Sequence, residues 1–206
     1  MTTPGLTSHT LRQAVKALCA RDPDLADIAS RHGTPPLWAR EPGFPTLLLI
    51  ILEQQVSLAS AAATFRRLEA ATNPLTPQAL LELDDSALRA IGFSRQKAGY
   101  ARGLAKAIAE ERFDPAALEA MSDQDARAEL LQLKGIGPWT ADIYLLMVLG
   151  RPDVMPVGDL ALQVAAQEVK GLDTRPSPDE LLDLAEAWRP WRSAAARLLW
   201  QHYLER

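Results

Sequence analysis

The stretch of sequence that decides the fold is residues 131–150, LQLKGIGPWTADIYLLMVLG. A helical apolar pattern leads into this stretch and ends at Leu133, and Pro138 presets the first turn of a second helix. Between these two points, Gly135 and Gly137 permit a turn with positive φ. The stretch therefore predicts two helices joined by a hairpin.

The hairpin is also a candidate binding site. The main-chain amides around Gly135, Gly137 and Trp139 are expected to cluster at the amino terminus of the second helix, where they can bind an anion such as a phosphate. Ile136, between the glycines, can point inward and hold the hairpin on the core. The alternative is a plain joint between helices, in which the glycines only reverse the chain.

A carboxylate follows the second helix. Residues 138–150 are apolar nearly all round, which predicts a central, buried helix. Asp159 comes twenty positions after Trp139, where the chain turns back from that helix. It can act in catalysis, or it can simply cap the next helix. Asp142 is a rival acid by proximity, and we expect it to face solvent or a neighbouring basic group.

The rest of the chain is expected to be helical as well. Strand signals are scarce, and apolar residues recur at helical spacing throughout. Gly92 stands where a helix should end, while Ser94 and Ser122 stand where helices should begin. The helix after Ser94 has positively charged sides, formed by Arg95, Lys97, Arg102 and Lys106. The sequence therefore predicts an all-α protein.

Composition sets limits on the fold and on partners. Of 206 residues, 48% are hydrophobic and 23% are charged, so one or two modest globular domains are expected. The net charge of −4 and the pI near 5.4 argue mildly against nucleic acid, although the total does not decide the charge of one surface. The single cysteine, Cys19, excludes an intramolecular disulfide, a multi-cysteine zinc site and a four-cysteine iron–sulfur cluster. It fits a reducing cytosol and is expected in the core.

Membrane and metal signals are weak. The amino terminus has no basic segment followed by an apolar run, and the longest apolar stretch, residues 44–52, is too short to span a bilayer. We therefore expect a cytoplasmic protein with no membrane partner. His9, His32, His202 and Cys19 show no metal-ligand spacing, so no side-chain metal site is expected.

Several of these motifs resemble one protein family. Residues 133–141 (LKGIGPWTA) and 157–159 (VGD) resemble the hairpin and the catalytic aspartate of the helix-hairpin-helix DNA glycosylases of base excision repair. Further segments are similar to the alkylation-repair branch, 3-methyladenine DNA glycosylase II: residues 51–59, 91–98 and 188–193, and then Trp200. The resemblance covers roughly residues 40–203. Longer members carry an amino-terminal β-rich domain, for which this compact chain has no room.

The resemblance implies the domain organisation. Residues 1–206 are expected to form a single glycosylase domain with two helical subdomains that flank an active-site cleft. The first is a central bundle of about residues 40–150, with the hairpin at 133–137. The second combines the N-terminal helices with residues 158–206.

The resemblance also implies a chemistry. It assigns catalysis to Asp159, whose charge would stabilise an oxocarbenium-like sugar and orient or activate water. Trp139 occupies the position where bifunctional relatives carry the lysine that forms a Schiff base, so no lyase activity is expected. Trp139, Trp200 and Tyr144 are implied to line the base pocket, with a place in the core as the alternative for the tryptophans. Lys134 is more suited to contact phosphate than sugar.

DNA contacts are implied at several surfaces. In the family, the turn at Gln54 and Gln55 supplies the side chain that fills the space left by the flipped nucleotide; the alternative is that both glutamines cap helix ends. Gln55 falls where one branch has a leucine. The implied DNA contacts are Gln54, Gln55, Ser57, Arg95, Lys97, Lys134, Gly135, Gly137 and Thr140. Further candidate phosphate ligands, or members of a solvated face, are Arg189, Arg192 and Arg197.

One cation site is implied at the hairpin. The family binds a monovalent cation there, Na⁺ or K⁺, through main-chain carbonyls that would be those of Leu131, Leu133 and Ile136. No cofactor is required and no iron–sulfur cluster is expected, which disfavours adenine-mispair activity. The missing lysine disfavours activity on oxidised bases.

Two other classes stay open. A non-catalytic DNA-binding module would need the hairpin amides but not Asp159, and a helical interaction scaffold would fit the acidic pI. A monofunctional glycosylase that acts as a monomer on double-stranded DNA with a damaged base accounts for more residues. We expect it to remove 3-methyladenine and 7-methylguanine faster than neutral hypoxanthine or ethenoadenine.

Overall fold

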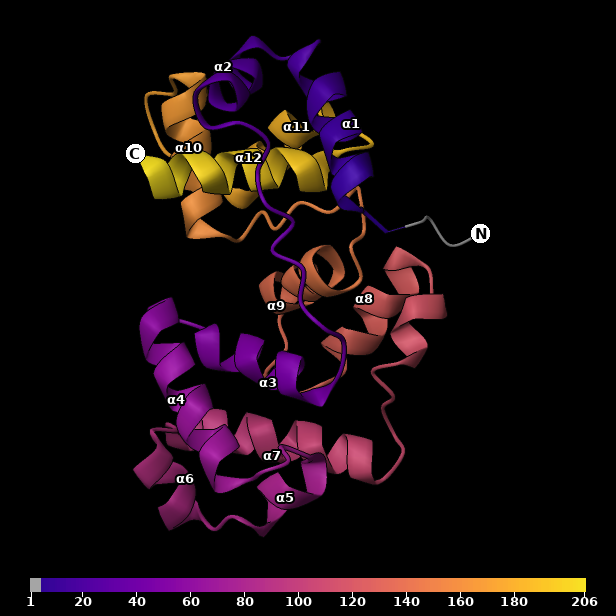
Figure 1. The fold of residues 1–206 in the computed structure, drawn as a ribbon, viewed down its shortest axis with the longest axis vertical. Helices are drawn as coiled ribbons and strands as arrows, with labels where there is room; N and C mark the ends of the chain where they lie inside the picture. Colours follow the sequence, from indigo (N-terminus) through magenta and orange to yellow (C-terminus); the bar gives the residue numbers. More distant parts are fainter. Residues whose placement is uncertain (1–4) are drawn as a thin grey trace. The chain divides into compact units, whose positions relative to one another are not determined.

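The computed structural model describes residues 5–206, and Figure 1 shows the helices of this part of the chain. No strand occurs among the described residues, which confirms the expected all-α class. The chain divides into two compact units. The continuous unit is Arg40–Tyr144, and the split unit combines the residues up to Ala39 with Leu145–Arg206. The boundary after Tyr144 comes slightly before the expected one at about residue 150.

The continuous unit is organised around its first helix. Its elements are α3 (Phe44–Glu53), α4 (Leu58–Ala71), α5 (Pro77–Glu82), α6 (Asp85–Ile91), α7 (Arg95–Ala109), the 3₁₀ turn η1 (Ala117–Ala120), α8 (Asp123–Leu131) and α9 (Pro138–Ile143). Helix α3 contacts α4, α7 and α9 (Figure 1). Its Leu47, Leu48, Ile50 and Ile51 have no exposed surface, and each such burial contributes about 1.5–3 kcal/mol. Because α3 is held from several sides, the turn that follows it starts from a fixed point.

The split unit is organised around its last helix. Its elements are α1 (Ser8–Cys19), α2 (Pro23–His32), the π-helical segment η2 that starts at the boundary (Tyr144–Val148), α10 (Leu160–Lys170), α11 (Pro178–Glu186) and α12 (Arg192–Glu205). Helix α12 contacts α1, α2 and α10 (Figure 1). Every residue from 193 to 200 is buried, so α12 is surrounded by its neighbours over two turns. No helix among residues 5–206 is both long enough and apolar enough to cross a bilayer.

The sequence correctly predicted where one helix ends and where two helices begin. Gly92 ends α6 in the left-handed region with φ +112°, and the side chains of Ser94 and Ser122 accept the Lys97 and Asp125 amides at the starts of α7 and α8. These three predictions are confirmed. They succeed because each depends only on the capping of unpaired backbone groups within one helical turn.

The helix expected over residues 138–150 differs from the prediction. Helix α9 ends at Ile143, and the chain continues as a π-helix over Tyr144–Val148. The Arg151 amide then donates to the Leu145 carbonyl at 2.9 Å, and Gly150 turns the chain with φ +64°. An apolar pattern records which side chains are buried, and it does not distinguish an α-turn from the wider π-turn.

Arg197 is buried inside the split unit. Its guanidinium, 1% exposed, donates to the carbonyls of Leu37 and Leu146 at 2.9 Å each, and to that of Ser193 at 3.0 Å. Burial lowers the pKa of Arg197 to about 10, so the group stays charged at neutral pH. This corrects the expectation that Arg197 is a phosphate ligand, because its donors are used inside the fold.

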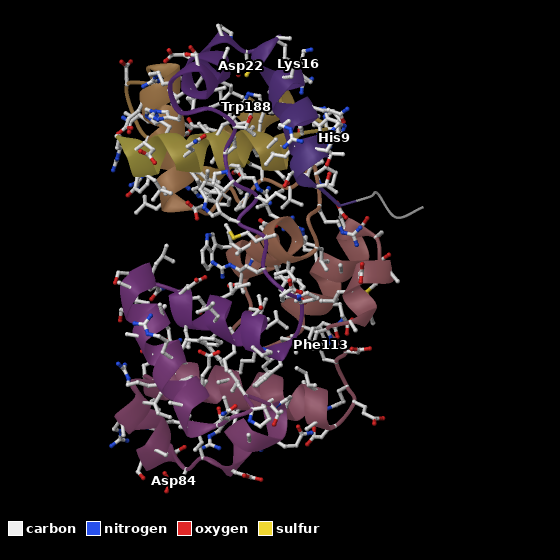
Figure 2. The ribbon with its side chains drawn as sticks, viewed as in Figure 1. His9, Lys16, Asp22, Asp84, Phe113 and Trp188 are labelled. Carbon is white, nitrogen blue, oxygen red and sulfur yellow. The ribbon has the colours of Figure 1, made fainter. Side chains whose placement is uncertain are left out.

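Asp22 joins helix α2, helix α10 and the turn after α11 in the split unit. Its carboxylate caps α2, accepts Lys170 Nζ on both oxygens at 2.8 Å, and accepts Trp188 Nε1 at 2.7 Å. Figure 2 shows Asp22 and Trp188 close together. Burial raises the pKa of the Asp22 carboxyl, but the hydrogen bonds from Lys170 and Trp188 outweigh it, so the pKa lies below the ordinary value of 3.8.

This network predicts a stability that depends on pH. Because the pKa of Asp22 is lower in the folded chain, its stabilisation is present above pH 3.8 and is lost as the pH falls through the folded value. We expect Asp22→Asn to lower the free energy of unfolding by about 2 kcal/mol at pH 7, with the difference from wild type shrinking below about pH 4. Urea unfolding from pH 7 to pH 3 measures this difference.

The matched control is Asp27→Asn. Asp27 pairs with Arg31 on an exposed face of α2, and such pairs contribute about 0–1 kcal/mol. We expect Asp27→Asn to follow the wild type across the pH range. A loss for Asp22→Asn that is as large at pH 3 as at pH 7 would contradict the assignment.

Candidate functional site

The predicted hairpin lies between α8 and α9 in the continuous unit. Helix α8 ends at Leu131, and Pro138 is the first residue of α9. Ile136 is 5% exposed and its amide donates to the Leu133 carbonyl at 3.0 Å, which confirms that it holds the turn on the core. Gly135 has φ +94°, as expected, but Gly137 has φ −96° and ψ 179°. The expectation of positive φ at Gly137 is therefore wrong.

The two glycine positions differ in the space around them. A Cβ at Gly135 would lie 2.2 Å from Cγ of Tyr100, so the turn sits directly on that ring. A Cβ at Gly137 would meet nothing within 4 Å, and Gly137 is exposed. Gly135 thus serves the packing of the turn. Gly137 leaves open space beside the start of α9, where the predicted amide contacts to a phosphate would be made.

The turn between α3 and α4 is tied to this hairpin. Gln54 Nε2 donates to the Gly135 carbonyl at 2.8 Å and to Thr140 Oγ1 at 2.9 Å. Gln55 is exposed and adopts φ +56°, and Ser57 caps α4 by accepting the Ser60 amide. The expectation that both glutamines contact DNA is revised, because the amide donors of Gln54 are used inside the protein. Gln55 stays the predicted inserting side chain.

Thr140 also departs from its predicted role. It is 2% exposed, and its hydroxyl oxygen accepts the hydrogen bond from Gln54. A buried threonine in this position supports the turn. Thr140 therefore does not offer its side chain to DNA.

The predicted basic ligands fall into two groups. Lys97 Nζ donates to the Leu52 carbonyl at the end of α3 at 2.6 Å, and burial lowers the pKa of this ammonium group. Arg95 and Lys134 are exposed, and their phosphate contacts stay a prediction. This corrects the expectation that Lys97 contacts phosphate, because its ammonium group is bound to the carboxyl-terminal end of α3.

Two arginines of the split unit are corrected in the same way. Arg192 Nε donates to Asp153 Oδ1 at 2.9 Å, and Arg189 Nη1 donates to Asp153 Oδ2 at 2.9 Å. Glu186 also pairs with both arginines. The cluster is neutralised by its own carboxylates, so it is not a free phosphate site.

Asp159 lies at the start of α10 in the split unit. Its Oδ1 accepts the Leu162 amide at 3.1 Å and Trp200 Nε1 at 3.2 Å. The ring of Trp200 in turn meets Trp38 edge to face, with 6.4 Å between ring centroids. Asp159 does cap a helix, as the alternative held, but the indole contact shows that its carboxylate is also oriented by a second, distant element.

The other predicted pocket residues are placed as follows. Trp139 is half-buried near the start of α9, and Trp200 is 8% exposed. Tyr144 has no exposed surface, and burial raises the pKa of its phenol. The contact of Trp139 and Trp200 with a base stays a prediction, whereas the buried Tyr144 offers no surface to a base, which corrects its expected place in the pocket lining. Asp142 is 3% exposed and pairs with Arg127, so of the two expected surroundings it has the neighbouring basic group.

The hairpin carbonyls partly fit the implied cation. The Leu133 carbonyl already accepts the Ile136 amide at 3.0 Å, and a carbonyl oxygen has a second lone pair that a cation can use. Occupation by Na⁺ or K⁺ stays a prediction. Among residues 5–206, no three His, Cys, Asp or Glu side chains lie together in a way that could hold a metal ion.

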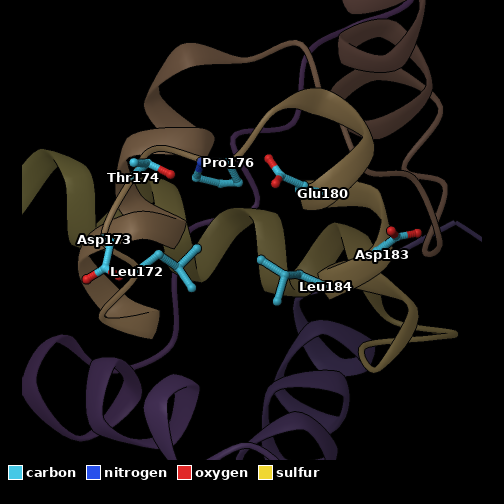
Figure 3. Close-up of a pocket in the computed structure, with 7 residues that line it drawn as sticks. All are labelled: Leu172, Asp173, Thr174, Pro176, Glu180, Asp183 and Leu184. Carbon is cyan, nitrogen blue, oxygen red and sulfur yellow. The ribbon is translucent and has the colours of Figure 1, made fainter.

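A surface hollow in the split unit lies apart from the predicted site residues. It has a volume of about 560 Å³ and is lined by Leu172, Asp173, Thr174, Pro176, Glu180, Asp183 and Leu184 (Figure 3). Glu180 is already engaged in the capping box with Ser177. None of the residues expected to act in catalysis or DNA binding lines this hollow.

Two features of the site were missed at the level of sequence. Trp38, in a loop with φ +48°, supports Trp200, and nothing in its neighbourhood along the chain signals that contact. The link from Gln54 to the hairpin spans more than eighty positions. The family resemblance pointed to the turn at Gln54 and Gln55, but nothing along the chain signalled its contact with the hairpin.

Comparison with known proteins gives the family context. A family model described as "HhH-GPD superfamily base excision DNA repair protein" matches residues 48–190. DNA-3-methyladenine glycosylase 1 of Schizosaccharomyces pombe is 32% identical over 167 residues, which are 79% of this chain and 72% of that protein. YfjP of Bacillus subtilis is 31% identical over 185 residues, which are 86% of this chain. The chain spans less than two thirds of the length of YfjP, 64%.

A solved structure is similar over nearly the whole chain. The S. pombe 3-methyladenine DNA glycosylase Mag1, in complex with abasic DNA, has a TM-score of 0.85 and 28% sequence identity. The match covers 91% of this chain and 95% of that one. The helical architecture is therefore that of a protein whose structure holds DNA.

Proposed function

Because the chain belongs to the HhH-GPD superfamily of base excision DNA repair proteins, we propose that it is a monofunctional DNA glycosylase. It binds duplex DNA as a monomer, extrudes an alkylated base such as 3-methyladenine, and hydrolyses the N-glycosidic bond without a required cofactor. The base must leave the stack because its glycosidic bond cannot be reached inside the duplex.

The observation that carries this proposal is the setting of Asp159. Its carboxylate follows the hairpin at the family's spacing and is oriented by the Leu162 amide and the Trp200 indole. A fixed negative charge lowers the barrier where positive charge develops, because it needs no reorganisation during the reaction. A capping role alone does not call for the indole of a helix residue 41 positions away.

The reaction then proceeds by hydrolysis. The bond between the sugar C1′ and the base nitrogen breaks, and the base leaves with the electron pair. Asp159 stabilises the oxocarbenium-like sugar while a water oxygen bonds to C1′ and gives up a proton. A base that is cationic through ring methylation leaves as a neutral molecule, so it needs no general acid. No step passes through a metal ion.

Trp139 supports hydrolysis over lyase chemistry. An indole cannot form the imine with the sugar that strand cleavage requires, and the family resemblance places Trp139 where the bifunctional relatives have a lysine. Water is therefore the nucleophile, and the product is an intact strand with an abasic site.

A panel assay tests the proposed function. Duplexes that contain 3-methyladenine, 7-methylguanine, hypoxanthine, ethenoadenine or uracil are incubated with the protein, and released base and strand breaks are measured separately. We expect released methylated base, with breaks only after alkali treatment. Borohydride should trap no covalent adduct. Binding without release of any base would identify a non-catalytic module, and no binding at low salt would identify a scaffold.

The rates on this panel should follow base charge. Trp139 offers an electron-rich face, and a cationic base gains about 0.5–2 kcal/mol of cation–π attraction there. We therefore expect 3-methyladenine and 7-methylguanine to be excised faster than hypoxanthine or ethenoadenine. Trp139→Ala should slow the cationic substrates roughly 2- to 30-fold more than the neutral ones. Equal single-turnover losses on both kinds of lesion would contradict this account of recognition.

A further inference from the structure

Gln54 connects two turns of the continuous unit that are far apart in the sequence. From the end of α3, its carboxamide reaches the α8–α9 hairpin and donates to the Gly135 carbonyl at 2.8 Å and to Thr140 Oγ1 at 2.9 Å. A glutamine Nε2 carries two hydrogens, so both are used. One acceptor lies in the turn itself and the other in the first turn of α9.

The end of α3 is held by other groups as well. Lys97 Nζ donates to the Leu52 carbonyl at 2.6 Å, and Arg40 forms two hydrogen bonds with Glu53 at 2.8 and 3.0 Å. These contacts fix the residues before Gln54 to α7 and to the start of the unit. The chain beyond Gln54 therefore leaves from a fixed platform.

The segment beyond Gln54 is exposed. Gln55 takes φ +56°, which is unusual for a residue with a side chain, and lies on the surface. Val56 and Leu58 are 44% and 65% exposed, so the turn presents apolar side chains beside Gln55. Such a turn is suited to enter a base stack, because apolar groups gain from contact with base faces and Gln55 supplies polar groups.

On the basis of the proposed function, we infer that Gln54 is a positioning residue for base extrusion. Its carboxamide fixes the exposed Gln55–Leu58 turn to the hairpin, so the side chain that enters the base stack is held in register with the part of the protein that grips the backbone. Gln54 does not touch the reacting atoms. Its effect is on opening the stack, and the bond-breaking step depends on Asp159.

This role makes a specific demand on side-chain chemistry. Gln54→Glu keeps the length but cannot donate a hydrogen bond when ionised. It would place a carboxylate against the Gly135 carbonyl oxygen and leave only the Thr140 hydroxyl able to donate to it. Gln54→Ala removes the link without adding charge. Gln78→Ala, on an exposed position of α5 in the same unit, is the matched control.

The experiment compares excision of 7-methylguanine from two duplexes under single-turnover conditions. In one, the lesion is paired with cytosine; in the other, it faces adenine as a mismatch. Opening a paired base costs more than opening a mismatched one, so a stack-opening defect should be larger on the paired duplex. We expect Gln54→Ala and Gln54→Glu to slow excision about tenfold or more from the paired duplex and less than about threefold from the mismatch. Gln78→Ala should match wild type on both.

A double-mutant cycle with Gln55 gives the second readout. If Gln54 acts through Gln55, Gln54→Ala should cost much less in the Gln55→Ala background than in wild type. Equal losses on paired and mismatched duplexes, together with additive effects of the two changes, would overturn the inference and leave the proposed function standing. Failure of wild type to release base from either duplex would instead overturn the proposed function.

Discussion

Asp159→Asn is expected to reduce base excision by about 10²–10³-fold while leaving duplex binding within a few-fold of wild type. The carboxylate charge is removed, but the shape is kept. Asparagine is a good helix cap, and its side-chain oxygen can still accept from the Leu162 amide and the Trp200 indole. The change therefore separates charge at the reacting centre from the support of α10. Single-turnover excision and equilibrium binding to the same lesion duplex measure the two effects.

A matched control tests whether the loss of excision is specific to Asp159 or follows from changing any helix-capping aspartate. Asp84 caps α6 by accepting the Ala87 amide at 2.7 Å and lies on the surface of the continuous unit (Figure 2). Asp84→Asn makes the same chemical change at another helix cap and should leave excision unchanged. Full activity in Asp159→Asn would refute the catalytic assignment. A loss of binding and folding in proportion to activity would show that Asp159 only caps its helix.

Gly135→Ala should give the largest loss of stability, about 2–4 kcal/mol. Two costs add at this position. The backbone has φ +94°, which an alanine adopts only with strain, and the added Cβ would lie 2.2 Å from the ring of Tyr100. The hairpin must move to relieve the contact, so the affinity for duplex DNA should fall as well. Urea unfolding and DNA binding measure the two losses.

Two further variants separate the backbone strain from the steric contact. Gly137→Ala introduces the same side chain two positions later, where φ is −96° and nothing lies within 4 Å, so it should stabilise the fold slightly. Tyr100→Ala removes the ring that the new Cβ would meet. In that background, Gly135→Ala should cost only the backbone strain, about 1–2 kcal/mol relative to Tyr100→Ala alone. If Gly135→Ala is as stable as Gly137→Ala, the turn does not depend on this glycine.

Short-range features of the molecule were predictable from sequence. The helix stop at Gly92, the caps at Ser94 and Ser122, and the inward direction of Ile136 each follow from the needs of a few adjacent backbone groups. The sign of φ at Gly137 was not predictable, because glycine permits both signs and the hairpin uses the positive region only at Gly135.

The roles of charged and polar side chains were harder to predict. A basic residue looks the same in sequence whether it faces solvent or is consumed within the fold. Lys97 binds the Leu52 carbonyl and Arg197 binds three carbonyls, and each of these partners is set by tertiary packing. Gln54 likewise finds acceptors that only the folded hairpin supplies. Local pattern thus located the turns, and long-range contacts decided which residues remain available at them.

The division of the chain into a continuous and a split unit sets an order for folding during synthesis. Every residue of Arg40–Tyr144 has been made before most of the split unit leaves the ribosome. By contrast, α1 and α2 pack on α12, whose last residue is Glu205, so their apolar faces wait roughly ten to thirty seconds at usual translation rates. For all of that interval, α1 and α2 lack the helix on which they pack, so the nascent chain exposes the apolar faces that α12 later covers.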